Sequence, residues 1–354
     1  MKTILVTAGG TGGHVFPALA IANALIAFRL NIVWVGSLKG IENELVPKYG
    51  IKLEKIAIFG LRKKGLLQLI KLPVMIIKAL YQAFKVVKAN KPSLVISFGG
   101  YASFPVAIIA RVLRIPLIIH EQNSVAGLTN KILAKFANTI LVAYKSVLPG
   151  KKTILVGNPV RVDILQLVDV EERYGSRIGG LRILILGGSL GAKIFNDNLP
   201  YVFENSDIIE SVIHQVGRGE VQPVQSLYNE LKINASVVNF IDDMAKTYSE
   251  VDLIICRAGA LTVSEVCVAG LAAIFIPYPH AVDDHQKFNA QPLVDCGAAF
   301  MLSQENFSIH KLAELINSLD RKKCLWMAIK ARGNAILDSK DQIIKVVKQH
   351  LLRL

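Results

Sequence analysis

The stretch ILVTAGGTGGH, residues 4–14, joins a short apolar run directly to a glycine-rich turn. A second stretch of the same kind, ILILGGSLGA, lies at residues 183–192. A buried strand that leads through a glycine-rich turn into a helix is typical of Rossmann-like sheets, where the turn lies at the ligand-binding edge. We therefore predict two Rossmann-like domains in tandem, each beginning at one of these stretches.

Further apolar runs follow each of the two stretches, and they lack the alternation of a half-exposed strand. Such runs predict parallel strands that are buried on both faces and separated by helices. They lie at residues 32–35, 94–96, 117–119 and 140–142 in the first half, and at residues 212–213, 237–238, 253–255 and 273–276 in the second. The predicted fold class is α/β, with two parallel-sheet domains.

The segment VGNP, residues 156–159, contains the glycine and the proline expected of a hinge between the two sheets. We place the domain boundary there, which predicts a first domain over residues 1–158 and a second over residues 159–337. The amphipathic pattern of residues 338–354 predicts a closing C-terminal helix.

The composition excludes several classes of protein. The 354 residues include four cysteines without a CxxC pair, and the histidines lack metal-ligand spacing. We therefore expect a reducing compartment and no structural metal. The apolar run at the N-terminus is too short for a signal peptide. Residues 92–110 carry no charge, but their prolines and glycines argue against a transmembrane span.

The net charge of +14 belongs to the first half, because residues 1–158 contain 21 Lys and Arg residues against 4 Asp and Glu residues. The region 55–120 has no acidic residue, and lysines recur there at intervals of seven, at Lys64, Lys71, Lys78 and Lys85. We predict a helix that binds an anionic membrane surface. The alternative is a core helix with a solvated lysine face. No known nucleic-acid-binding motif accompanies the charge, so we expect no nucleic-acid partner.

Both glycine-rich turns can hold a phosphate, because backbone N–H groups and a helix N-terminus would face the ligand. A tight turn without a ligand is the alternative for either one. His14 follows the first turn and is predicted to act as a general base, unless it merely caps the next helix. A nicotinamide cofactor is disfavoured because Gly36-Ser37 stands where a ribose-binding carboxylate would be needed.

Polar residues also follow other predicted strands, at residues 97–101, 120–123 and 283–286. In the second half, residues 256–265 pass from a strand into a helix that carries Glu265, which is placed to bind a ribose diol. A solvated helical glutamate is the alternative. No DxD motif is present, so we expect a departing diphosphate to be stabilised by helix N-termini and Arg161 without a chelated metal.

Five motifs together resemble the MurG family, the bacterial N-acetylglucosaminyltransferases of peptidoglycan lipid synthesis. They are TAGGTGGH at 7–14, GGY at 99–101, HEQN at 120–123, GNPVR at 157–161 and ALTVSE at 260–265. The resemblance implies a GT-B fold whose two domains face a cleft. It also implies inverting transfer of GlcNAc from UDP-GlcNAc to the C4 hydroxyl of MurNAc in undecaprenyl-diphospho-MurNAc-pentapeptide, which converts lipid I to lipid II.

The resemblance also implies roles for individual residues, with His14 as the catalytic base. Donor binding is expected of Thr11, Gly12, Gly13, Asn123, Arg161, Ser189, Ile241, Ala260, Leu261, Thr262, Val263, Ser264, Glu265 and Gln286. Acceptor binding is expected of Gly10, Gly99, Gly100, Tyr101, His120 and Glu121. The chain departs from the family pattern at Leu190 and His285, where glutamine is common. Side-chain contacts at these two positions are not carried over.

By the same resemblance, we expect a peripheral protein at the cytoplasmic face of the bacterial inner membrane. Its partners would be UDP-GlcNAc, lipid I, anionic lipid, and proteins of cell-wall synthesis and division. Three rivals stay open: a diacylglycerol glycosyltransferase, a nucleotide- or nucleic-acid-binding protein, and a sugar-nucleotide epimerase. The lipid acceptor distinguishes the first, tight nucleic-acid binding without turnover the second, and release of free products without lipid the third.

Overall fold

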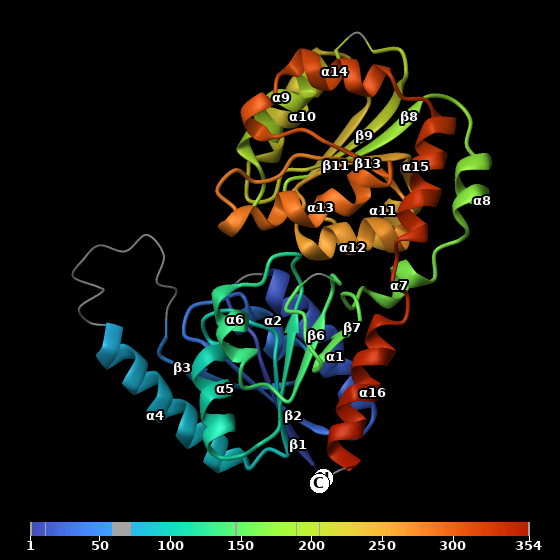
Figure 1. Ribbon diagram of the computed structural model, residues 1–354. Helices are drawn as coiled ribbons and strands as arrows, with labels where there is room; N and C mark the ends of the chain where they lie inside the picture. Colours follow the sequence, from blue (N-terminus) through green and yellow to red (C-terminus); the bar gives the residue numbers. More distant parts are fainter. Residues whose placement is uncertain are drawn as a thin grey trace. The chain divides into compact units, whose positions relative to one another are not determined.

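The computed structural model describes residues 2–10, 12–58, 72–145, 147–188, 190–204 and 206–352. Their contacts divide the chain into two compact units. Unit 1 contains residues 1–159 and 338–354, and unit 2 contains residues 160–337. Each unit is built around one parallel β-sheet (Figure 1).

Unit 1 has a seven-stranded sheet of order β3-β2-β1-β4-β5-β6-β7, in which all neighbouring strands pair in parallel. Its strands are β1 (Thr3–Thr7), β2 (Asn31–Ser37), β3 (Lys52–Ile56), β4 (Leu94–Ser97), β5 (Leu117–Glu121), β6 (Thr139–Val142) and β7 (Thr153–Leu155). Its helices are α1 (Gly12–Ala27), α2 (Glu42–Lys48), α4 (Leu72–Asn90), α5 (Ser103–Val112), α6 (Leu128–Leu133) and α16 (Ser339–Leu352).

Unit 2 has a six-stranded parallel sheet of order β10-β9-β8-β11-β12-β13. Its strands are β8 (Leu181–Leu186), β9 (Ile209–Gln215), β10 (Ala235–Val238), β11 (Leu253–Cys256), β12 (Ala272–Phe275) and β13 (Ala299–Met301). Its helices are α7 (Val162–Leu165), α8 (Val170–Gly175), α9 (Lys193–Val202), α10 (Val221–Glu230), α11 (Met244–Glu250), α12 (Ala260–Ala269), α13 (His285–Asp295), α14 (Ile309–Asn317) and α15 (Arg321–Gly333), with short 3-10 turns η1 (Val282–Asp284) and η2 (Gln304–Asn306).

Apolar side chains cover both faces of each sheet, as the uninterrupted apolar runs predicted. In β1, Ile4 and Val6 belong to one buried cluster and Leu5 belongs to another on the opposite face. The first of these clusters includes Ile343 and Val347 of α16, which packs on α1 of unit 1. The α/β class with two parallel-sheet domains is therefore confirmed.

The edge strands β3, β7 and β13 are not among the strands that the apolar runs predicted. Strand β3 reads KLEKI and buries only its last residue fully, and β7 exposes 40% of Ile154 and 40% of Leu155. An edge strand that is covered on one side does not need an uninterrupted apolar run.

Within the described residues, none of the helices combines the length and the apolar character that crossing a bilayer requires.

Candidate active site

Four of the residues that the sequence analysis singled out lie outside the described residues: Thr11, Ser189, Lys64 and Lys71. The other expected site residues lie mostly at the ends of strands or the beginnings of helices in one of the two units. In a parallel sheet these positions share the carboxyl edge, where such folds bind ligands.

The loops after β1 and β4 meet in unit 1, and glycine makes their approach possible. Gly100 has a φ of +80°, and a Cβ atom there would lie 2.3 Å from the carbonyl oxygen of Gly9. Gly99 also has a positive φ, and a Cβ there would lie 3.2 Å from Cδ2 of His14. The structure therefore brings His14, in the first turn of α1, beside the Gly99-Gly100 turn.

Tyr101 belongs to the same corner of unit 1. A Cβ atom at Gly10 would lie 3.0 Å from Cε1 of Tyr101, so the phenol ring covers Gly10. The Tyr101 hydroxyl lies 3.4 Å from the hydroxyl of Ser37. These contacts place Gly10 and Tyr101 together at the strand ends, and acceptor binding by each of them stays a prediction.

Glu42 is a buried residue of this corner that the sequence analysis missed. Its Oε1 accepts hydrogen bonds from the N–H and the hydroxyl of Ser37, at 2.9 and 2.7 Å, and its Oε2 accepts one from the Gly10 N–H at 3.2 Å. A Cβ atom added to Gly9, Gly36 or Gly40 would lie 2.8 Å or less from an atom of the Glu42 side chain, so the three glycines leave the space that this side chain occupies. The Gly10 N–H is thus bonded to a carboxylate here, and the expected acceptor binding by Gly10 stays a prediction.

The end of β5 holds its polar residues inside unit 1. His120 is fully buried, and its Nε2 lies 2.9 Å from the carbonyl oxygen of Gly157. Burial lowers the pKa of His120 to about 4, although the Gly157 contact acts in the opposite direction, so the ring is neutral at physiological pH. The side chain of His120 therefore faces the protein interior, and an acceptor contact by it stays a prediction.

Glu121 organises the loop that follows β5. It is 2% exposed, and its Oε1 accepts from the backbone and side-chain nitrogens of Asn123 at 3.0 and 3.2 Å. Its Oε2 accepts from the Gly127 N–H at 3.0 Å and from Nδ2 of Asn130 at 2.9 Å. The carboxylate thus fixes Asn123, which is a predicted donor contact, at the edge of the sheet.

In unit 2, Glu265 lies in α12 and receives two partners. Its Oε1 accepts hydrogen bonds from Nε and Nη2 of Arg161, at 3.0 and 2.9 Å, and its Oε2 accepts one from the hydroxyl of Tyr248 at 3.1 Å. Burial lowers the pKa of Arg161, but the Glu265 carboxylate outweighs it, so that the pKa lies above its ordinary value. The structure therefore joins two predicted donor-binding residues, Arg161 and Glu265, in one ion pair.

The remaining predicted residues of unit 2 that the structure describes lie in α12, at the beginning of α13 and, for Ile241, just before α11. Ala260 and Val263 are buried, and Leu261, Thr262 and Ser264 are half-buried. Gln286 accepts a hydrogen bond from the Tyr278 N–H at 2.9 Å. The N–H of Ile241 donates to Oε1 of Gln215 at 3.1 Å, so a backbone contact between this N–H and a base stays a prediction.

Two features of this edge carry strain or charge that the sequence did not reveal. Asp283 and Asp284 both have a φ of +50°, an uncommon conformation that often marks a functional loop. Arg257 donates to the carbonyl oxygens of Ile276 and Pro277 at 2.9 and 3.1 Å. Burial lowers its pKa to about 10.

Among the described residues, no three His, Cys, Asp or Glu side chains form a group that could hold a metal ion.

Comparisons with known proteins show the family to which the chain belongs. Residues 4–142 match the glycosyltransferase family 28 N-terminal domain, and residues 182–345 match the glycosyltransferase family 28 C-terminal domain. A protein of Ralstonia nicotianae is 43% identical over 98% of this chain and 95% of its own length. One of Neisseria meningitidis is 43% identical over 97% of each chain. Both are named UDP-N-acetylglucosamine--N-acetylmuramyl-(pentapeptide) pyrophosphoryl-undecaprenol N-acetylglucosamine transferase.

Solved structures give the same result. The crystal structure of Acinetobacter baumannii MurG is 38% identical, with a TM-score of 0.88, and covers 99% of this chain and 100% of that one. UDP-GlcNAc 2-epimerase from Neisseria meningitidis covers 100% of both chains at a TM-score of 0.66. It is only 14% identical, so this second likeness concerns the fold alone.

Proposed function

Because the chain belongs to the MurG family within glycosyltransferase family 28, we propose a residue-level account of the reaction of this family. The fold is GT-B, and the enzyme is an N-acetylglucosaminyltransferase. It moves GlcNAc from UDP-GlcNAc to the C4 hydroxyl of MurNAc in lipid I, which yields lipid II for peptidoglycan synthesis. The observation that carries this function is the 43% identity over nearly the whole length of two such transferases. Diacylglycerol as acceptor is not favoured.

His14 is the proposed base. In an inverting transfer, the C4 oxygen of the acceptor attacks C1 of GlcNAc and forms the new bond. The bond from C1 to the diphosphate breaks, and its electron pair leaves with UDP. The C4 hydroxyl proton must go to a base as the bond forms. A position in the first turn of α1, beside the Gly99-Gly100 turn, supports His14 for this task.

Unit 2 is proposed to hold the donor nucleotide. Glu265 presents a carboxylate that can accept hydrogen bonds from the two ribose hydroxyls, and Arg161 supplies a cation for the diphosphate. The backbone N–H groups at the beginning of α12 and the helix dipole favour an anion at that end. These groups would stabilise departing UDP without a chelated metal, which agrees with the lack of a DxD motif. The second glycine-rich turn, which follows β8 and contains Ser189 in the sequence, is proposed to bind the donor phosphate.

Helix α4 is proposed to attach the enzyme to the cytoplasmic face of the inner membrane. One stripe of this helix exposes apolar and basic side chains together: Val74, Ile77, Lys78, Tyr81, Lys85 and Lys88. Val74 is 70% and Ile77 66% exposed, which is costly for apolar side chains in water and favourable at an acyl-chain boundary. The opposite side of α4 buries Ala79, Ala83 and Val87.

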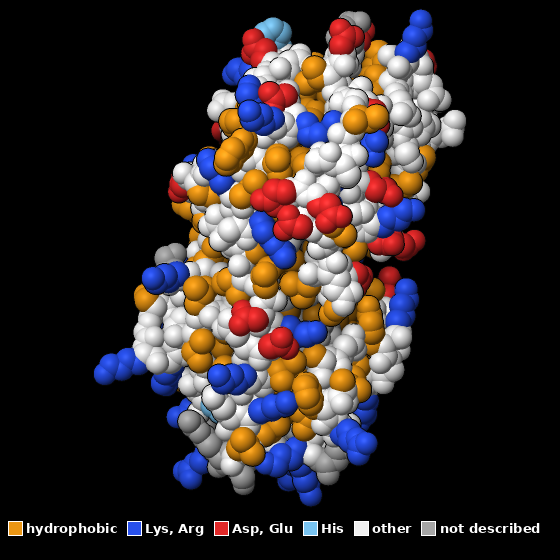
Figure 2. Space-filling view, turned by 90° about the vertical axis from the view of Figure 1, so that its right-hand side faces the viewer, with side chains coloured by type: hydrophobic (Ala, Val, Ile, Leu, Met, Phe, Trp, Pro, Cys, Tyr) orange, Lys and Arg blue, Asp and Glu red, His pale blue; other side chains and the backbone are white. Residues whose placement is uncertain are grey.

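The charge of unit 1 supports the same attachment. On the face in Figure 2, unit 1 shows many Lys and Arg side chains and few Asp and Glu side chains, in agreement with the 21 basic and 4 acidic residues of the segment 1–158. A basic surface attracts anionic lipid headgroups. Such a peripheral enzyme would act beside proteins of cell-wall synthesis and division, with effects on cell shape.

Radiolabel transfer tests the proposed function against its rivals. Purified protein is incubated with UDP-[14C]GlcNAc and with lipid I, diacylglycerol or no lipid, each with and without EDTA. We expect a labelled lipid only with lipid I, at equal rates in both buffers. Product only with diacylglycerol would support the glycolipid alternative, and product without lipid would support an epimerase. Loss of lipid I product in EDTA would overturn the metal-free account alone.

A further inference from the structure

Tyr248 contacts the proposed ribose-binding carboxylate, although neither the sequence motifs nor the family comparison assigned it a task. Its hydroxyl donates to Oε2 of Glu265 at 3.1 Å. Tyr248 lies in α11 and is fully buried, whereas the Glu265 side chain is 13% exposed. The hydroxyl therefore approaches the carboxylate from the interior of unit 2 and leaves its other side accessible.

The two partners of Glu265 differ in how easily they can be exchanged. A carboxylate offers about four lone-pair sites, of which Arg161 uses two on Oε1 and Tyr248 uses one on Oε2. A ribose diol donates two hydrogen bonds, so at least one existing contact must give way. The Arg161 side chain is 45% exposed and can turn into solvent or toward a phosphate. The ring of Tyr248 is enclosed and keeps its place.

The side chain of Arg173 binds the backbone of Tyr248. Its Nη1 donates to the carbonyl oxygen of Tyr248 at 3.1 Å, while its Nη2 donates to the carbonyl oxygens of Ala269 and Gly270, the latter at 3.1 Å. One buried guanidinium thus connects α11 at Tyr248 with the C-terminal end of α12, the helix that carries Glu265. A cation is favourable there because the carbonyl groups of two helices point toward it.

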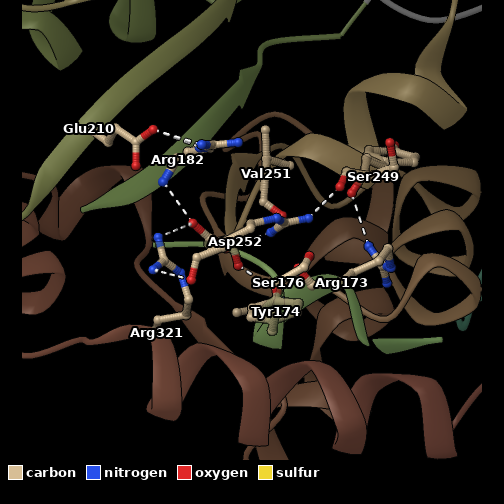
Figure 3. A network of polar contacts seen from close by, with 12 residues as sticks. Arg173, Tyr174, Ser176, Arg182, Glu210, Ser249, Val251, Asp252 and Arg321 are labelled. Atoms are coloured by element: carbon tan, nitrogen blue, oxygen red, sulfur yellow. Dashed lines mark hydrogen bonds and ion pairs between the residues drawn. The ribbon is translucent and has the colours of Figure 1, made fainter. Parts of the chain in front are cut away.

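Arg173 is itself part of a larger buried polar network in unit 2. Figure 3 shows Arg173 among the residues of this network, and the hydroxyl of its chain neighbour Tyr174 donates to the carbonyl oxygen of Asp252 at 2.6 Å. The Asp252 carboxylate receives Nη1 of Arg177 at 2.5 Å and the Arg182 N–H at 2.9 Å. These contacts connect Tyr174, the chain neighbour of Arg173, with Asp252 just before β11.

We propose that Tyr248 is a positioning residue that fixes the Glu265 carboxylate in the orientation that accepts the two ribose hydroxyls of the donor. The proposal rests on the donor-binding role of Glu265 in the proposed function. Burial, with Glu265 as a further cause, raises the pKa of Tyr248 well above its ordinary value. The hydroxyl therefore keeps its proton and donates throughout the physiological pH range.

Calorimetric binding of UDP and of 2′,3′-dideoxy-UDP to the full chain tests the proposal, because only UDP offers the diol. In Tyr248→Phe we expect the Kd of UDP to rise about tenfold, the effect of losing one hydrogen bond to a charged group. The Kd of dideoxy-UDP should stay at its wild-type value. Tyr228→Phe is the matched control: it removes another buried hydroxyl of unit 2, one that lies 3.0 Å from Nδ1 of His214.

Glu265→Ala separates failure of this proposal from failure of the proposed function. If Glu265→Ala removes the preference for UDP over dideoxy-UDP while Tyr248→Phe keeps it, the positioning role of Tyr248 is overturned. If Glu265→Ala itself keeps the preference, Glu265 does not bind the diol, and both assignments fall. Equal weakening of both ligands in Tyr248→Phe would show a general loss of structure and would likewise contradict the proposal.

Discussion

Arg161 and Glu265 form a bidentate contact in which Nε and Nη2 of the guanidinium share one carboxylate oxygen, at 3.0 and 2.9 Å. Both residues are proposed to bind parts of the same donor, the diphosphate and the ribose. In this state each neutralises the other. Nucleotide binding is therefore expected to separate them, with the ribose taking the carboxylate and a phosphate taking the cation.

Arg161→Ala tests this exchange. Loss of a charge-assisted contact to phosphate should raise the Kd of UDP roughly 10- to 100-fold. Uridine has no phosphate, so its Kd should change less than about threefold or fall, because Glu265 is freed from a competitor. Calorimetry or ligand-detected NMR with both ligands measures the difference.

Arg182→Ala provides the control for that experiment, because Arg182 pairs with Glu210 at 2.8 Å in the same unit and the variant loses the same charge. The Kd of UDP for this variant should stay near the wild-type value. Parallel weakening of uridine and UDP in Arg161→Ala would mean that Arg161 orients Glu265 and does not bind phosphate.

Charge reversal on α4 tests the membrane assignment. Replacing Lys78, Lys85 and Lys88 by Glu should weaken binding to vesicles containing phosphatidylglycerol by at least about 3 kcal/mol, roughly a hundredfold, because each lysine contributes about 1 kcal/mol at an anionic surface. Sedimentation with vesicles at physiological salt measures the partition. Turnover of a soluble acceptor analogue should be unchanged.

The control for α4 reverses three exposed lysines of unit 2, Lys246, Lys311 and Lys322, and so changes the net charge equally. This variant should keep most of its vesicle binding. Equal losses in the two variants would mean that only net charge matters, and an unaffected α4 variant would remove the helix from the membrane surface.

The buried His120 predicts an acid-dependent loss of stability. Its pKa is about 4 in the folded protein and 6.5 when unfolded, so between these values the unfolded chain binds the extra proton. The contribution of neutral His120 to the free energy of unfolding is therefore fully present above about pH 6.5. It falls as the pH decreases toward 4, by roughly 2 kcal/mol at pH 5. For the wild type, urea unfolding at each pH measures this free energy, and hydrogen exchange of the β5 amides measures the stability around His120.

His120→Gln removes the titrating group while an amide can still donate to the Gly157 carbonyl. Between pH 7.5 and pH 5, the free energy of unfolding of this variant should fall by roughly 2 kcal/mol less than that of the wild type. Identical pH dependence of the two proteins would contradict the assignment of a neutral, buried His120.

The fold could be predicted where burial leaves a simple trace in the sequence. Strands such as β1 and β11 are covered on both faces, so nearly every position is apolar. Edge strand β3 has three charged residues among its five and could not be recognised in this way. Its pairing with β2 depends on tertiary structure that a local pattern does not contain.

The site could be predicted only for residues within glycine-rich or family-like motifs. The one sequence signal that singles out Glu42 is that it is one of four acidic residues in the first 158 residues. Its contact with Gly10, 32 positions away, becomes visible only in the folded unit. Tyr248 and Arg173 stand on ordinary helices without any motif, and their importance arises from packing around Glu265 and the end of α12.

The measurement that tests the central claim most directly is the transfer of GlcNAc from UDP-GlcNAc to lipid I by His14→Ala, alongside UDP binding to the same variant. We expect kcat to fall roughly 10²- to 10⁴-fold, because a general base is lost, while the Kd of UDP stays within about threefold. The control His310→Ala removes an exposed histidine of unit 2 and should match wild type. Transfer by His14→Ala at nearly the wild-type rate would contradict the account.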